Sequence, residues 1–284
     1  MSEPGTLAIG IGAQKGGTTS VWQALQAQPW FDPATAKELN YFSRRFGLGD
    51  DWYRAQLPTP RHGRVRGEVS VSYLTHPAAP ERIQAFDPNA RLFVVLRDPV
   101  ERAISAHLHG SRDGWPGVSG TIEDVLSGAE ASWTADRLPR SLGDGCYHRD
   151  LSRYFEHLEP ERLHVLFLEE LVADPEGQLR ALFLHLGAPP ASIVSPLELP
   201  HANAYRSALF PRLQRALVVG ARRSAHRGRM RTSRRLLRAE AFLGLRDGSV
   251  ERPEVPASTR AALREFYAEA DVALARLLGR PLPW

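Results

Sequence analysis

The chain contains little that would cross-link it or hold it in a membrane. Cys146 is the only cysteine among 284 residues, so no intrachain disulfide can form and a reducing compartment is favoured. No apolar run approaches the roughly 20 residues of a membrane-spanning helix, and residues 1–5 have neither the basic nor the apolar part of a signal peptide. From these absences we expect a cytoplasmic protein.

Acidic residues are missing from one long segment. Residues 212–238 contain ten arginines and no aspartate or glutamate, although the formal net charge of the whole chain is only +4. The arginines do not alternate with aromatic residues, which argues against nucleic-acid binding. Three interpretations stay open for this segment: a solvated helical face, a site for an anionic acceptor, or a contact with an anionic membrane or a carrier protein.

A glycine-rich turn lies near the N-terminus. The apolar residues 9–12 lead into Ala13-Gln14-Lys15-Gly16-Gly17-Thr18-Thr19, where an amphipathic segment begins. Glycines let backbone N–H groups approach phosphate oxygens, a helix that begins at Thr18 adds the positive end of its dipole, and Lys15 adds a full charge. The pattern indicates a strand, a phosphate-binding loop and a helix, although an ordinary glycine-rich turn shares it.

The same turn lacks the order of a nucleoside-triphosphate loop. In G-x-x-x-x-G-K-[ST] the lysine follows the last glycine, whereas Lys15 precedes Gly16 and Gly17. No acidic residue in an evident magnesium-binding position follows a predicted strand. We therefore expect a phosphate compound whose charge is neutralised by protein groups, without a metal. A nucleotide or metabolite kinase is the alternative enzyme, and a non-catalytic nucleotide-binding partner protein is the alternative outside enzymes.

Apolar runs of strand length alternate with helical patterns along the chain. The patterns predict strands at 7–12, 65–69, 91–96 and 163–168, and helices at 18–28, 79–86, 99–111, 174–187 and 258–278. Such alternation indicates an α/β fold with a central parallel sheet flanked by helices, in a single domain over residues 1–284. Within it we expect a loop insertion at 113–144 and an arginine-rich helical segment at 206–244.

A second cationic residue, Arg97, follows the strand predicted at 91–96. Ligands of parallel α/β sheets bind beyond the carboxyl ends of the strands, so one nucleotide could contact both Lys15 and Arg97. A guanidinium can bind phosphate through two hydrogen bonds, and Ser105 can add a hydroxyl. A salt bridge from Arg97 to a neighbouring carboxylate is the alternative. Arg102 is expected at the surface or in an ion pair.

Six segments carry the chain's most specific signal. They read QKGGTT at 14–19, KELNYF at 37–42, GEVSVSYL at 67–74, LRDPVERAIS at 96–105, GCYHRDL at 145–151 and LGRPLPW at 278–284. Together they resemble the sulfotransferases that use 3′-phosphoadenosine 5′-phosphosulfate (PAPS), closest to the heparan-sulfate-type and related bacterial members. The resemblance implies a P-loop-like sulfotransferase fold, no metal, and transfer of a sulfuryl group to a hydroxyl, less readily an amine, of a carbohydrate, glycolipid or secondary metabolite.

The resemblance also implies roles for single residues. The 5′-phosphosulfate of PAPS would be held by Lys15, Gly16, Gly17, Thr18 and Thr19, and the 3′-phosphate by Arg97 and Ser105. Tyr147 would close over the cofactor, and Asn203 and Arg206 would cover the 3′-phosphate. Lys15 would also act on the charge that builds on the leaving oxygen, and Glu38 matches the family's usual catalytic base. The product would be adenosine 3′,5′-bisphosphate (PAP).

The acceptor side of the expected site is less sharply marked. By the resemblance it would be lined by Lys37, Glu68, Ser70 and Tyr73. Lys37 and Glu38 could instead form a solvated charge pair, Tyr73 and Tyr147 could be core aromatics, and Glu68 could be the base or orient Lys15. Because histidine is the base of cytosolic small-molecule sulfotransferases, the fallback bases are His62, His76 and His201. Asn40 stands where the family often has a histidine.

Overall fold

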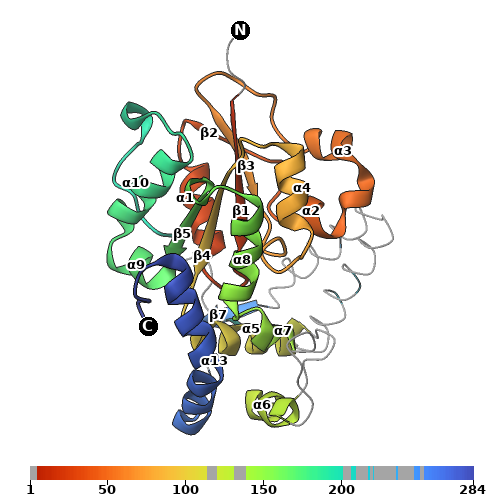
Figure 1. The fold of residues 1–284 in the computed structure, drawn as a ribbon, viewed down its shortest axis with the longest axis vertical. Coiled ribbons are helices and arrows are strands. Elements are labelled where there is room, and N and C mark those ends of the chain that lie inside the picture. The colour runs from red at the N-terminus through yellow and green to blue at the C-terminus, as the bar shows by residue number, and fades with distance from the viewer. Residues whose placement is uncertain are drawn as a thin grey trace. The chain divides into compact units, whose positions relative to one another are not determined.

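A five-stranded parallel sheet, with strand order β2-β3-β1-β4-β5, organises the first part of the structure (Figure 1). The strands are β1 (Thr6–Gly12), β2 (Phe31–Pro33), β3 (Val65–Val69), β4 (Arg91–Leu96) and β5 (Leu163–Phe167). The four longer strands confirm the expectation from the apolar runs. The three residues of β2, Phe-Asp-Pro, are too few to show a periodic pattern, and sequence reasoning missed this edge strand.

The computed structural model describes residues 5–113, 120–130, 139–200, 206–208, 217, 220, 235, 246–249 and 253–284. The chain divides into two units. The first comprises residues 1–102, 144–203 and 267–284, and the second comprises residues 103–143 and 204–266. The sheet belongs to the first unit. That residues 1–284 act as a single domain stays a prediction.

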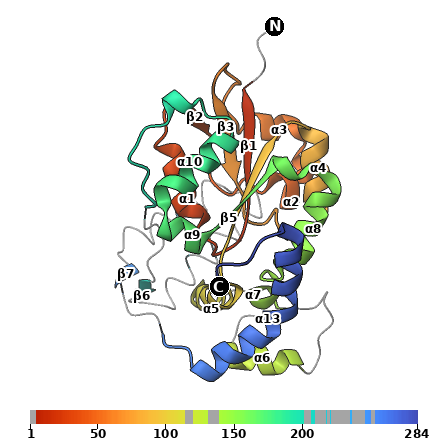
Figure 2. The ribbon, with the colours of Figure 1, turned by 60° about the vertical axis from the view of Figure 1, so that its left-hand side comes forward.

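Helices cover both faces of the sheet (Figures 1 and 2). On one face, side chains of β1, β4 and β5 share a core with α2 (Tyr41–Arg44), α3 (Asp50–Arg54), α4 (Ala79–Phe86) and α8 (Tyr147–His157). On the other face, they share a core with α1 (Thr18–Gln26), α9 (Leu168–Ala173) and α10 (Pro175–His185). A strand buried on both faces needs apolar side chains at every position, which explains the unbroken apolar run of β4.

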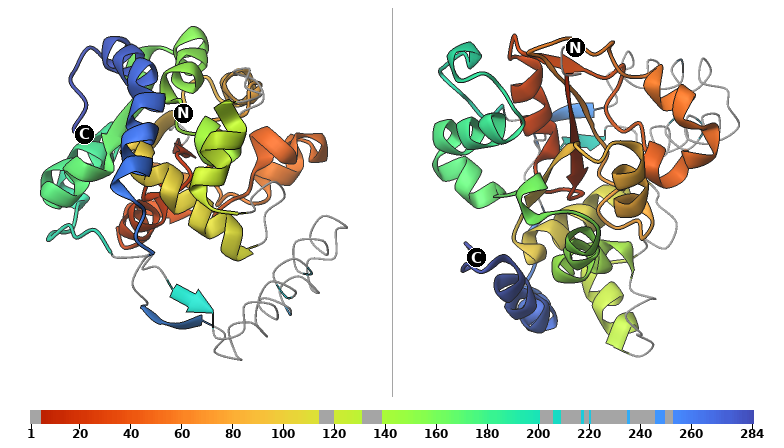
Figure 3. Two further views of the ribbon diagram at one scale, coloured as in Figure 1. Left: turned by 90° about the horizontal axis from the view of Figure 1, so that it is seen from below. Right: turned by 45° about the horizontal axis from the view of Figure 1, so that its top comes forward.

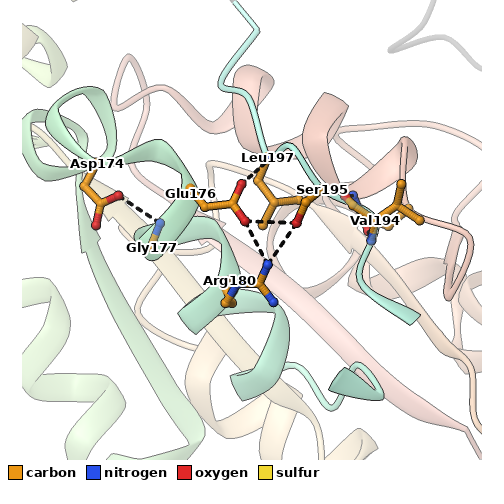
Figure 4. A network of polar contacts seen from close by, with 8 residues as sticks. Asp174, Glu176, Gly177, Arg180, Val194, Ser195 and Leu197 are labelled. Atoms are coloured by element: carbon orange, nitrogen blue, oxygen red, sulfur yellow. Dashed lines mark hydrogen bonds and ion pairs between the residues drawn. The ribbon is translucent and has the colours of Figure 1, made fainter. Parts of the chain in front are cut away.

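The ends of α10 lie at the capping residues that the sequence contains. Asp174 is the N-cap of α10 and accepts a hydrogen bond from the Gly177 N–H at 2.9 Å. Gly187 follows the helix with a φ of 93°, a backbone conformation that favours glycine. Glu176, in the first turn of α10, accepts hydrogen bonds from the Leu197 N–H at 2.6 Å and the Ser195 hydroxyl at 2.9 Å (Figure 4). This carboxylate ties the segment after α10 to the helix.

The second unit departs from the sequence analysis in two places. Residues 113–144, expected to be a loop insertion, contain the helices α6 (Ile122–Glu130) and α7 (Arg140–Gly143). Arg206–Ala208, placed in a helical segment, is the strand β6, which pairs antiparallel with β7 (Arg246–Ser249). Strand pairing over so few residues depends on a partner 40 residues away, which local propensity does not register. Of residues 209–245, the structure describes only 217, 220 and 235, which are helical.

Two long helices belong to both units. One is α5 (Pro99–Asp113), and the other is α13 (Ala257–Leu278), whose last turns and C-terminal tail belong to the first unit. Figure 3 shows α13 in blue, with the C-terminal tail following it. Leu274 packs in the core beside α8, the Trp284 ring meets the Phe167 ring at 5.2 Å, and the Arg280 guanidinium lies 4.3 Å from the same ring. The LGRPLPW ending thus packs against β5. None of the helices in the described ranges is both long and apolar enough to span a bilayer.

Candidate functional site

The predicted site residues gather at the carboxyl ends of three neighbouring strands. The loop of Lys15 follows β1, Arg97 follows β4, and the Glu38 N–H donates to the carbonyl oxygen of Val69 at the end of β3, at 2.8 Å. Since β1 lies between β3 and β4, all three segments share one edge of the sheet. The chain reverses its direction of winding at β1, and such a switch point is where ligands of open α/β sheets bind.

The loop after β1 makes a tight turn against β4. The Ala13 N–H donates to the Val95 carbonyl oxygen at 2.9 Å, and the Gly16 N–H donates to the Ala13 carbonyl oxygen at 3.0 Å. A Cβ at Gly16 would lie 2.2 Å from the Val95 carbonyl oxygen, so only glycine fits there without moving the backbone. Lys15 has a φ of 66°, which a non-glycine residue adopts at a cost. Backbone strain of this kind concentrates at functional sites.

The helix α1 begins directly after this turn. Gly17, with a φ of 97°, occupies the N-cap position and has no side chain with which to cap the helix. The first N–H groups of an α-helix have no intrahelical acceptor and carry the positive end of the helix dipole. Thr18 and Thr19 add hydroxyls in the first turn. The arrangement can hold an anion beside the half-buried Lys15.

Arg97 is held from two directions. Its guanidinium donates to the Lys15 carbonyl oxygen at 3.5 Å and lies 3.7 Å from the Glu101 carboxylate, with its side chain 22% exposed. Its own carbonyl oxygen accepts a hydrogen bond from the Tyr147 hydroxyl at 2.9 Å. Tyr147 is buried, and burial raises the pKa of its hydroxyl, which therefore stays a donor. Tyr147 is thus a core aromatic at the start of α8, and its hydroxyl fixes the backbone of Arg97.

Glu38 stands on a strained loop between β2 and α2. Its φ is 63°, and its carboxylate accepts the Val71 N–H at 3.1 Å and pairs with Lys37 at 2.8 Å. The Glu38 side chain is 35% exposed, so a substrate can reach it. The ion pair with Lys37 is the charge pair that the sequence analysis gave as the alternative to a catalytic Glu38. The pair forms, and the Glu38 carboxylate is still accessible.

Asn40 closes this loop, a role that sequence reasoning did not assign. Its φ is 54°, its amide Nδ2 donates to the Glu38 carbonyl oxygen at 2.7 Å, and its own N–H donates to the Ser70 hydroxyl at 2.9 Å. Asparagine tolerates the left-handed region better than most residues because its short side chain can bond locally. The signal that would have found it is the asparagine itself, placed just before the aromatic residues Tyr41 and Phe42.

Glu68 lies inside the protein beneath this loop, 1% exposed. Its carboxylate accepts hydrogen bonds from the hydroxyls of Ser70, at 2.6 Å, Tyr73 and Tyr53. Burial raises the pKa of Glu68 to about 7, against the hydrogen bonds of Ser70 and Tyr73, which lower it. Ser70 and Tyr73 are fully buried as well. This burial argues against the expectation that Glu68, Ser70 and Tyr73 line the acceptor side, since an acceptor in solvent meets none of them.

Other expected residues belong to the second unit or lie outside the described ranges. Ser105 is on the part of α5 that belongs to the second unit. The backbone of Arg206 is in β6 of the same unit, and its side chain, like Asn203 and His201, lies outside the described residues. Arg102, expected at the surface or in an ion pair, is fully buried, and it bonds to Tyr267 with Tyr147 and Asp144 close by. Tyr147 on α8 and Tyr267 on α13 lie far from Arg102 along the chain, so local sequence does not show this burial.

Comparison with known proteins finds sulfotransferases. The model of the sulfotransferase family matches residues 72–192. Heparan sulfate glucosamine 3-O-sulfotransferase 3A1 of Mus musculus is 32% identical over 203 residues, which are 66% of this chain and 50% of that protein. The human (Homo sapiens) heparan sulfate glucosamine 3-O-sulfotransferase 6 is 32% identical over 177 residues, 61% of this chain and 49% of that protein. The chain spans about half the length of these curated relatives.

A solved structure shares the fold over nearly the whole chain. A sulfotransferase from Alicyclobacillus acidocaldarius superposes with a TM-score of 0.66 at 22% identity, covering 98% of this chain and 97% of that one. This likeness confirms the expected P-loop-like sulfotransferase fold. The matching family model and the relatives confirm the resemblance to sulfotransferases that the six sequence motifs carry.

Proposed function

We propose that the protein transfers the sulfuryl group of PAPS to a hydroxyl of a carbohydrate or another small acceptor. One observation carries the proposal: the phosphate-type loop of Lys15, the cation Arg97 and the accessible carboxylate of Glu38 share the carboxyl edge of three adjacent strands. The relatives are named as sulfotransferases that act on heparan sulfate glucosamine, which supports a glycan acceptor. An amine, a glycolipid or a secondary metabolite stays within the same chemistry.

The residues present fit a nucleotide with phosphates at two positions. Gly16 leaves no room for a side chain against β4, the first turn of α1 offers N–H donors, and Lys15 and Arg97 supply two cations. PAPS, when bound, supplies the sulfuryl group and a leaving 5′-phosphate. Lys15 would neutralise charge on the leaving oxygen, and the N–H groups of residues 17–19 would hold the phosphate oxygens. The Gly16 N–H, expected to join them, already donates to the Ala13 carbonyl oxygen. The described residues hold no cluster of three metal-ligating side chains, and metal independence is part of the proposal.

Glu38 would accept the proton of the acceptor hydroxyl as that oxygen forms its bond to sulfur. Proton removal by a positioned carboxylate commonly contributes about 10²–10⁴-fold to the rate. The Val71 N–H holds one carboxylate oxygen, and Lys37 contacts the other and would be close to the incoming acceptor. The remaining contributions are positioning and neutralisation of charge. Contact of residues 212–238 with an anionic membrane or a carrier protein is a further part of the proposal, based on their ten arginines.

Calorimetry with PAP and ADP, each with and without Mg²⁺, tests the proposal. We expect PAP to bind without metal and more tightly than ADP, because only PAP places charge at both ends of the ribose. A metal-dependent preference for ADP would indicate a kinase instead.

A further inference from the structure

Two hydroxyls connect the buried Glu68 carboxylate to the loop that carries Glu38. The Ser70 hydroxyl donates to Oε2 of Glu68 at 2.6 Å and accepts the Asn40 N–H at 2.9 Å. The Tyr73 hydroxyl donates to Oε1 of Glu68 and accepts the Tyr41 N–H at 2.8 Å. Each oxygen of the carboxylate therefore directs one of these two hydroxyls, and each of the two holds one backbone N–H of the loop.

The two N–H groups belong to the residues directly before and at the start of α2, immediately after the strained part of the loop. Glu38 and Asn40 both have positive φ, with values of 63° and 54°. Residues in this region persist only when the surrounding structure holds them there. The Asn40 and Tyr41 N–H groups are two such points of attachment, and the Asn40 side chain joins them to the Glu38 carbonyl oxygen.

We propose that Glu68 is a positioning residue for the base: its carboxylate orients Ser70 and Tyr73, which fix the loop that aims Glu38 at the acceptor. The assignment of Glu38 as the base rests on the proposed function, whereas the anchoring of the loop by Glu68 does not. Glu68 is too deeply buried to meet an acceptor itself.

The ionised form of Glu68 is the one that satisfies this network. As a carboxylate it accepts from both hydroxyls, whose lone pairs then receive the Asn40 and Tyr41 N–H groups. A protonated Glu68 has one oxygen that donates, and the hydroxyl of Ser70, Tyr73 or Tyr53 that receives this hydrogen has to turn its own hydrogen elsewhere. The groups that act on Glu68 include the Tyr73 and Tyr53 hydroxyls and the negative charge of Glu38. The Tyr53 hydroxyl reaches Glu68 from α3 at 3.4 Å.

Substitution of Glu68 by glutamine, which keeps the shape and removes the charge, tests the anchoring. We expect hydrogen exchange of the Asn40 and Tyr41 amides to accelerate in Glu68→Gln, and to accelerate for Asn40 alone in Ser70→Ala and Tyr41 alone in Tyr73→Phe. Glu156→Gln, at an exposed position on α8, is the matched control and should leave both amides unchanged. Unchanged exchange in a folded Glu68→Gln protein would overturn the proposal.

Transfer from labelled PAPS to heparan sulfate tests the consequence for the base. A small displacement of a reacting group can cost about a hundredfold, so kcat should fall about tenfold to a hundredfold in Glu68→Gln with little change in KM or in PAP affinity. The rise of wild-type kcat with pH near neutrality should disappear in this variant. A kcat within twofold of wild type would refute the positioning role. A wild type that is inactive with heparan sulfate, and whose Asn40 and Tyr41 exchange still depends on Glu68, would refute heparan sulfate as the acceptor and support the anchoring.

Discussion

The guanidinium of Arg97 donates to the carbonyl oxygen of Lys15 at 3.5 Å, and this contact ties the end of β4 to the loop after β1. Two cationic residues separated by 82 positions thereby become neighbours. Because their strands are adjacent and parallel, no other element is needed to bring them together. The contact is the basis for expecting one ligand with two phosphates at this edge.

Removal of the Arg97 side chain should weaken PAP binding without abolishing the fold. A hydrogen bond to a charged group contributes about 1.5–3 kcal/mol, so Arg97→Ala should raise the Kd for PAP about tenfold to a hundredfold in calorimetry. Arg276→Ala, at an exposed position on α13, removes an equal charge and should leave the Kd unchanged. Equal losses in the two variants would mean that general surface charge, and not Arg97, attracts the nucleotide.

A methyl group at Gly16 should distort the phosphate-type loop. Its Cβ would meet the Val95 carbonyl oxygen at 2.2 Å, and backbone cannot give way as a flexible side chain does. We expect Gly16→Ala to lower the free energy of unfolding by about 1–3 kcal/mol and to weaken PAP binding. Gly47→Ala is the matched control, because a Cβ at Gly47 has no atom within 4 Å. Urea unfolding and calorimetry on both variants measure these effects. A Gly16→Ala protein as stable as Gly47→Ala, with unchanged PAP affinity, would contradict the close approach.

Neutralisation of Glu38 should separate binding from turnover. Glu38→Gln keeps the size of the side chain, and its loss of basicity should lower kcat by about 10²–10⁴-fold. Since Glu38 lies on the loop between β2 and α2 and not on the phosphate-type loop, PAP affinity should stay within twofold. Glu81→Gln, exposed on α4, serves as the control for both measurements. Wild-type turnover in Glu38→Gln would move the base to another residue.

Ionisation of Glu68 should cost the protein stability. Its pKa is raised by burial from 4.5 to about 7, so the folded state holds the proton more firmly than the unfolded state does. The stabilisation from protonated Glu68 is complete below about pH 4.5 and is lost as the pH rises to about 7. The difference corresponds to about 3 kcal/mol.

Urea unfolding at pH 5 and pH 8 measures this effect. The wild type should lose stability relative to Glu68→Gln over this interval, because glutamine does not ionise. A wild type that gained stability relative to the variant would mean that Glu68 is better stabilised as a carboxylate than its burial implies.

Most strands and helices of the sheet-bearing unit were predictable from the sequence. The ranges expected at 65–69, 79–86 and 91–96 are those of β3, α4 and β4, because each is an apolar or amphipathic run bounded by turn residues. The same runs, with Lys15 after one strand and Arg97 after another, were enough to place two cations at one edge of a parallel sheet. The sequence was enough because the end of each strand is recognised from its own residues, where the apolar run stops and a turn residue follows.

What only the tertiary structure decided is the surroundings of single polar groups. Glu68 and Arg102 look like exposed charges in the sequence, yet strands and helices distant along the chain enclose both. The strained backbone of Glu38 and Asn40 is equally invisible in the sequence, because the contacts that hold it come from Ser70 and Tyr73, some 30 residues away. Sequence determined which residues end the strands. The packing of distant segments decided which of those residues solvent can reach, because burial and hydrogen bonding are properties of the assembled chain.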